Sequence, residues 1–148
     1  MVKTMYDFRP IVVLDDARTR EIIEFIKNEN LTYLDDNLCY TEEYRGYSIA
    51  VMRHVDLGHL CGYIDLAEEN INEKQYNLLD RLAHGGITHY INNEIGFDCG
   101  HCYDIMPYSC FNNLFCSGKY RDFNYVLNNL KEMVDALVES KGGQLQCG

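Results

Sequence analysis

The sequence predicts one α+β domain, 1–148, with a mostly antiparallel sheet and helices packed on one of its faces. Length is the first observation, because 148 residues is a common size for a single domain. Composition is the second, because 47% hydrophobic residues and only two prolines favour a folded chain with an ordinary core. The third is the order of the periodic segments, which is helix, strands, helix, strands, helix, without a repeat or a linker.

The first predicted element is a helix over residues 15–27. Asp15 or Asp16 can cap its N-terminus, and apolar residues recur on one of its faces. We interpret residues 1–30 as an N-terminal helical addition to the domain. The apolar face consists of Ile22, Ile23 and Ile26.

Strand-like segments follow this helix. An acidic, turn-forming triplet at 35–37 separates two short runs, and a third run alternates apolar and polar residues as a half-buried strand does. A fourth run contains Gly62, which indicates a bulge or a close approach of another chain segment. The predicted strands are 31–34, 38–41, 47–52 and 60–66.

A second helix is predicted from Asn72 and Gln75, which have the spacing of a capping box. The helix should run through Leu82. Gly85 and Gly86 then break the chain. The residues expected to be buried are Leu78, Leu79 and Leu82.

A hairpin and a long loop come next. Strands at 87–91 and 94–98 should turn on Asn92 and Asn93, because asparagine tolerates the backbone conformation of a tight hairpin turn. The segment 100–118 has no clear period, and irregular loops of that length in compact domains are usually functional or mobile.

The last predicted helix has the most continuous apolar stripe. Asp122 should cap it and Gly142 should lie just past its end, with 143–148 as a flexible tail. We expect this helix to be the main element of the core. The stripe consists of Phe123, Val126, Leu127, Leu130, Val134, Leu137 and Val138.

The formal net charge of −10 argues against general nucleic-acid binding, because a negative field repels phosphate backbones. The charge permits docking onto a basic partner surface, and it permits a small anionic ligand only where local Arg or Lys residues override the field. No apolar run approaches the roughly 18 residues of a membrane helix, and the N-terminus is too polar for a signal peptide. We therefore expect a cytoplasmic protein that does not bind membranes, with mostly free thiols among its seven cysteines. A homo-oligomer is one possible assembly state.

Residues that carry chemistry are concentrated at 84–104. This segment holds three of the five histidines and two of the seven cysteines. Metal binding is one interpretation, because Cys99 and Cys102 form a CxxC pair that suits zinc. The sequence has no second CxxC pair. The remaining zinc ligands beside Cys99 and Cys102 could be His84, His59 or Cys61. We therefore expect no stoichiometric zinc and no cofactor.

Catalysis is a second interpretation of the segment. Cys99 with His84 or His101 could form a thiolate–imidazole pair, oriented by Asp98 or Asp104. However, the chain has neither a nucleophile elbow nor a metalloprotease motif. We assign no catalytic residue, and we favour a protein that is not an enzyme.

Ligand binding is the third interpretation. Gly85 and Gly86 let a ligand approach the backbone closely, and Thr88 offers a hydroxyl group. Arg53, Arg81 or Arg121 could offset phosphate charge, and Tyr63, Tyr90, Phe97 or Tyr103 could stack on a base. The simpler alternative is that the glycines form a turn, the aromatic residues belong to the core, and Arg121 pairs with a carboxylate. The predicted ligand-binding set is His84, Gly85, Gly86, Thr88, Asp98, His101, Tyr63 and Arg121.

The hairpin should bring this set together. The start of one strand lies beside the end of the other, so His84, Thr88, Asp98 and His101 should converge at one end of the sheet. Loops held by such a scaffold often carry functional groups. The rival interpretation is that Asp98 and His101 only fix the following loop by bonding its backbone.

Four ordered motifs resemble a group of small proteins encoded by phages and prophages. These proteins carry a G-Y-[IV] strand, an H-G-G-[IL]-T turn, a G-F-D-C-[AG]-H segment and a Y-R-D entry to the last helix. Corresponding residues occur here at 62–64, 84–88, 96–101 and 120–122. The chain departs from the pattern because it lacks tryptophan and because Cys102 has no counterpart.

The resemblance implies a viral accessory protein that acts in the host bacterial cytoplasm and counters host defences. One implied route is a non-enzymatic sponge that sequesters a nucleotide-derived immune signal. Another is direct binding to a bacterial defence protein, similar to anti-CRISPR inhibitors. A third is an enzyme that degrades a nucleotide signal.

Overall fold

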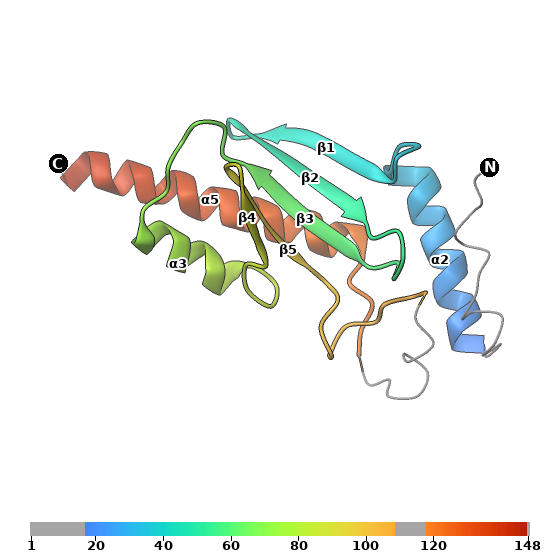
Figure 1. The fold of residues 1–148 in the computed structure, drawn as a ribbon. Coiled ribbons are helices and arrows are strands. Elements are labelled where there is room, and N and C mark those ends of the chain that lie inside the picture. The colour runs from blue at the N-terminus through green and yellow to red at the C-terminus, as the bar shows by residue number, and fades with distance from the viewer. Residues whose placement is uncertain (1–16, 109–117, 148) are drawn as a thin grey trace.

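The computed structural model describes residues 17–108 and 118–147, and the side chains of 20–108 and 118–142 (Figure 1). A five-stranded antiparallel sheet lies at its centre, in the strand order β1-β2-β3-β5-β4. The α+β class with an antiparallel sheet is thereby confirmed. The described elements are α2 (Ala17–Tyr33), β1 (Cys39–Tyr44), β2 (Tyr47–Arg53), β3 (Leu60–Asp65), α3 (Glu73–Leu82), β4 (His89–Ile91), β5 (Glu94–Asp98) and α5 (Phe123–Cys147).

Helix α2 is longer than predicted, and the strand predicted at 31–34 is wrong. The amide of Leu34 donates to the carbonyl of Asn30 at 3.2 Å, which continues the helical pattern. Leu31 is 86% exposed, so its apolar character does not mark a buried strand. The predicted caps, Asp15 and Asp16, lie outside the described residues. The predicted apolar face is confirmed, with Ile23 and Ile26 buried and Ile22 packed beside them.

The central strands β2 and β3 form where they were predicted. Alternate residues of β2 are buried, as the period of two requires. Gly62 in β3 marks a close approach and not a bulge, because the pairing register runs through it without interruption. A Cβ atom at Gly62 would lie 2.9 Å from the Phe97 ring and 3.1 Å from Leu130.

Helix α5 crosses one face of the sheet, with α3 beside it (Figure 1). The side chain of Asp122 accepts from the amide of Tyr125 at 2.9 Å, so the predicted N-cap is confirmed. The predicted end at Gly142 is wrong, because the helix continues through 143 to Cys147. The fully buried residues of α5 are Val126, Leu130, Met133, Val134 and Leu137.

The capping box of α3 is confirmed, since Asn72 and Gln75 exchange side-chain to backbone hydrogen bonds. Leu79 is fully buried, but Leu82 is 36% exposed, contrary to prediction. The buried residues of α3 are Gln75 and Leu79, so only a narrow stripe of this short helix is covered.

The hairpin of β4 and β5 turns on Asn92 and Asn93, as predicted. Both residues are left-handed, with φ of 53° and 64°, which fits a two-residue hairpin turn. Strand β4 begins two residues later than predicted. None of the helices in the described ranges has the length and apolar composition that crossing a membrane requires.

Candidate functional site

The end of α3 places His84. The side chain of Asn129 on α5 accepts from the His84 amide and donates to the Leu82 carbonyl, both at 2.8 Å. A buried asparagine therefore satisfies two backbone groups that the end of a helix leaves unpaired. This clamp fixes His84 against α5, where its side chain is only 6% exposed.

Gly85 brings the next chain segment close to His84. Its φ of +70° favours glycine, and a Cβ atom there would lie 2.3 Å from Cε1 of His101. The group that approaches the backbone of Gly85 in the structure is therefore the His101 ring. Gly86 (φ +91°) closes the turn by donating its amide to the Ala83 carbonyl.

A parallel bridge brings Asp104 to Arg121. The amide of Ile105 donates to the Lys119 carbonyl at 2.8 Å, and the Lys119 amide donates to Tyr103 at 3.1 Å. The side chain of Arg121, two residues after Lys119, is therefore held beside Asp104.

Asp104 is the centre of the resulting site, and its side chain is completely buried. Nε2 of His84 lies 2.9 Å from both carboxylate oxygens, and Nε of Arg121 donates to Oδ1 at 2.8 Å. His101 contacts Oδ2 through its backbone amide at 3.0 Å and through Nδ1 at 3.1 Å. We call His84, His101, Asp104, Arg121 and Tyr125 the Asp104 cluster.

Aromatic side chains surround the Asp104 cluster. The hydroxyl of Tyr125 lies 2.7 Å from Nδ1 of His84, and its ring lies 5.2 Å from the Arg121 guanidinium carbon. Tyr103 stacks on His101 with ring centroids 5.2 Å apart and an interplanar angle of 6°. The exposed side of the site therefore presents an imidazole, a guanidinium and two phenol rings.

The charges in the Asp104 cluster stabilise one another. Burial alone would raise the pKa of Asp104, but hydrogen bonds from His84 and Arg121, and then from His101, hold that pKa below its ordinary value. Burial likewise opposes the charge of Arg121, but its bond to Asp104 raises the pKa of the guanidinium. Asp104 and Arg121 are thus an ionised pair.

The structure places the remaining predicted residues outside the Asp104 cluster. Thr88 donates its hydroxyl to Asp98 at 2.9 Å, and Asp98 also accepts from the amide of Gly100. No hydrogen bond between described residues joins this pair to the Asp104 cluster. Tyr63 on β3 packs over Gly96 and meets His89 edge to face. The predicted convergence therefore holds for His84 and His101, while Thr88 and Asp98 form a separate contact.

The two cysteines of the CxxC pair differ in environment. Cys99 is buried and Cys102 is exposed. Burial, and then the nearby charge of Asp104, raises the pKa of Cys99 far above its ordinary value. Neutral, buried Cys99 does not have the electropositive surroundings that activate a thiolate nucleophile.

Arg53 has a structural role. It is 2% exposed and bonds Glu29, Tyr120, the Gly58 carbonyl and Asn30. Arg121 pairs with a carboxylate, as the simpler alternative anticipated, although the partner lies 17 positions earlier in the chain.

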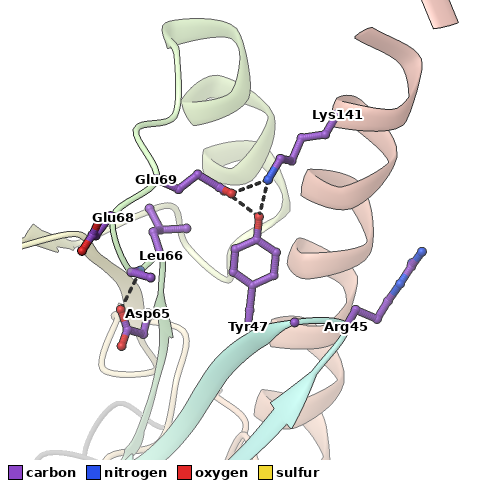
Figure 2. A pocket seen from close by; sticks show the side chains of 9 residues that line it. Arg45, Tyr47, Asp65, Leu66, Glu68, Glu69 and Lys141 are labelled. Carbon is purple, nitrogen blue, oxygen red and sulfur yellow. Dashed lines mark hydrogen bonds and ion pairs between the residues drawn. The ribbon is translucent and has the colours of Figure 1, made fainter. Parts of the chain in front are cut away.

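A separate groove of about 540 Å³ lies near the other end of α5 (Figure 2). Its Lys141 bonds Glu69 and the Tyr47 hydroxyl, and Arg45 at its rim pairs with Asp135. Both cations are thus matched by carboxylates. Lys141 is 16 residues from Tyr125, or about 24 Å along a helix, so the groove is not part of the Asp104 cluster. The acidic lining makes it a poor site for an anion.

Comparison of the chain with models of protein families, with curated proteins and with solved structures finds no match. The functional argument therefore depends on the geometry of the Asp104 cluster and on the motifs at 84–88, 96–101 and 120–122.

Proposed function

We propose that the protein is a phage-encoded immune-evasion protein that sequesters a phosphate-bearing, nucleotide-derived signal at the Asp104 cluster without turning it over. The motifs that resemble phage and prophage proteins support the biological setting. His84, His101 and Arg121, which lie in three of those motifs, contact one buried carboxylate, and this supports the location of the site.

Arg121 is the observation that carries the proposal. It uses only Nε toward Asp104, and its two outer nitrogens have no hydrogen-bond partner among the described residues. Its side chain is 19% exposed. A guanidinium that is fixed on one edge and has no partner among the described residues on the other suits bidentate binding of a phosphate. In a chain of net charge −10, such a group supplies the local positive charge that an anion requires.

The aromatic surroundings fit the rest of a nucleotide. Tyr103 is 44% exposed and Tyr125 is 39% exposed, so both have ring surface available for a base. Stacking of a base on an aromatic side chain contributes about 1–3 kcal/mol and tolerates different bases. The buried, protonated thiol of Cys99 favours sequestration over covalent chemistry.

Arg121→Gln should weaken nucleotide binding by about 10- to 100-fold, the equivalent of one or more lost charge-assisted hydrogen bonds. The probes are linear and cyclic di- and trinucleotides, titrated calorimetrically after mass spectrometry of small molecules released from the purified protein. Arg45→Gln is the matched control, because Arg45 forms an Arg–Asp pair of the same 2.8 Å length on the exposed surface.

Arg121→Lys separates loss of binding from loss of the fold. It keeps a positive charge beside Asp104 but cannot bind a phosphate through two nitrogens. It should fold and still bind weakly. Equal affinity for the wild type and both Arg121 variants would contradict the proposed site.

Direct binding to a bacterial defence protein is a second candidate function. The net charge of −10 favours it, because an acidic surface can oppose a groove that binds nucleic acid. A wild-type chain that binds none of the nucleotides but still blocks host defence would favour this alternative.

A further inference from the structure

The Asp104 cluster contains a set of atoms typical of a metal site. We propose that His84 Nε2, His101 Nδ1 and the Asp104 carboxylate bind one divalent transition-metal ion of the zinc type. Among the described residues, these side chains form the group whose ligand atoms lie within 4.8 Å of one another. Two imidazoles and one carboxylate are a common donor set for such ions, with positions left for water or substrate.

The spacing of the donor atoms suits a metal ion. Metal–ligand bonds of about 2.0–2.2 Å place the ligand atoms of a tetrahedral zinc site about 3.3–3.6 Å apart. His84 Nε2 lies 2.9 Å from the carboxylate, and His101 Nδ1 lies 3.1 Å from Oδ2. Movements of a few tenths of an ångström in these side chains would therefore bring the two pairs of atoms to the separations of metal ligands.

The groups behind the three ligands orient them as metal ligands are usually oriented. The second ring nitrogen of His84 meets the Tyr125 hydroxyl at 2.7 Å. Asp104 Oδ1 accepts from Arg121 Nε at 2.8 Å, and Oδ2 accepts from the His101 amide at 3.0 Å, so a second lone pair of Oδ2 can bind the ion. Histidine and carboxylate ligands almost always have outer partners of this kind. When Nε2 of His84 binds the ion, the ring proton lies on Nδ1, where the Tyr125 hydroxyl oxygen can accept the hydrogen bond. His101 binds through Nδ1, so its ring proton lies on Nε2.

Burial and charge indicate what completes the coordination shell. His84 and Asp104 are nearly inaccessible, but the His101 side chain is 23% exposed and opens the site on one side. With Asp104 and Arg121 cancelling, a divalent ion leaves two positive charges uncompensated. An anion such as hydroxide or a phosphate group would therefore be favoured at the open positions. This site differs from the Cys99–Cys102 pair, and one ion per chain would reverse the expectation from sequence that the protein binds no stoichiometric zinc.

Zinc titration of the chelator-treated full chain tests the proposal directly. We expect one ion per wild-type chain, and His101→Asn should weaken binding by more than about 100-fold, beyond the loss typical of outer partners. His101 is partly exposed, so this variant should fold, as circular dichroism would verify. Tyr125→Phe should weaken binding by about 10- to 100-fold.

Two control variants locate the ion. His89→Asn removes a histidine that pairs with Glu94 on the surface, and Cys102→Ser removes the exposed thiol. Both should bind zinc like the wild type. The proposal fails if the wild type binds no more zinc than His101→Asn, or if Cys102→Ser abolishes binding.

The metal inference does not depend on the nucleotide proposal, because zinc alone is the probe. Zinc binding without nucleotide binding in either the metal-free or the loaded chain contradicts the proposed function and leaves the metal site standing. If the wild type takes up no zinc but binds nucleotide, and Arg121→Gln loses that binding, the metal site is contradicted and the proposed function stands.

Discussion

At the scale of single residues, Asp104 determines how the candidate site is organised. A carboxylate has about four lone-pair positions, and four nitrogen atoms of His84, His101 and Arg121 lie within hydrogen-bonding distance of this one. A buried charge is tolerated when it is paired and hydrogen-bonded in this way. The partly exposed side chains of His101 and Arg121 are therefore held in position by a buried carboxylate.

His59 provides a prediction about pH. It is 5% exposed, and burial, followed by the neighbouring His54, lowers its pKa to about 4. The unfolded chain binds a proton at this position below about pH 6.5, whereas the folded chain does not until about pH 4. Stability should therefore fall as pH is lowered from 6.5 to 4, by up to roughly 3 kcal/mol from this residue.

Urea titrations between pH 7.5 and pH 4 measure this dependence. His59→Gln should flatten the pH profile, while His89→Gln, which alters a partly exposed histidine, should leave it steep. A His59→Gln profile as steep as that of the wild type would assign the acid sensitivity to other groups.

The sequence predicted part of the candidate site. Dense chemistry and the glycine turn pointed to His84 and His101. Arg121 was one of three arginines considered to offset phosphate charge, and Asp104 was considered only as an orienting group for a catalytic base. Tyr125 and Asn129 were missed, because their partners lie 41 and 45 positions away and each resembles a polar helix residue. Tertiary contacts of that separation leave no local signal in a single chain.

At the scale of elements, local chemistry predicted structure where the deciding contacts are local. The capping box at Asn72 and the hairpin turn at Asn92 depend on groups three residues apart or fewer. The end of α2 is different. Glu29 and Asn30 bond Arg53 on β2, and these distant contacts hold the chain helical through residues that otherwise favour a strand.

Gly142 tests where α5 ends. A glycine just past a helix end usually has a positive φ, whereas Gly142 lies inside the helix, and a Cβ atom there would meet nothing within 4 Å. Gly142→Ala should therefore stabilise the protein by about 0.5–1 kcal/mol, because alanine is the better helix former. The midpoint of urea unfolding measures the effect. A loss of stability would show that the sequence-based end point was right.

At the scale of the whole molecule, Glu29 and Arg53 join three parts of the fold. Arg53 on β2 bonds Glu29 on α2 at 3.1 Å, and both contact the hydroxyl of Tyr120. Glu29 also accepts from the amide of Phe123, the first residue of α5, at 2.7 Å. The segment interpreted from sequence as an N-terminal addition thus reaches the centre of the domain.

Arg53→Met tests whether α2 is integral to the domain. The substitution leaves the Glu29 carboxylate buried beside an apolar side chain, and breaking one side of a buried ion pair costs about 3–5 kcal/mol. The double variant Glu29→Gln with Arg53→Met should recover part of this loss, since no uncompensated charge remains. Arg45→Met is the control, because its pair with Asp135 is exposed and should contribute less than about 1 kcal/mol.

In urea, the wild type should unfold in one transition seen equally by far-ultraviolet circular dichroism and tyrosine fluorescence. If α2 were a separate addition, Arg53→Met would cost no more than Arg45→Met, and helical signal would be lost in a distinct early step.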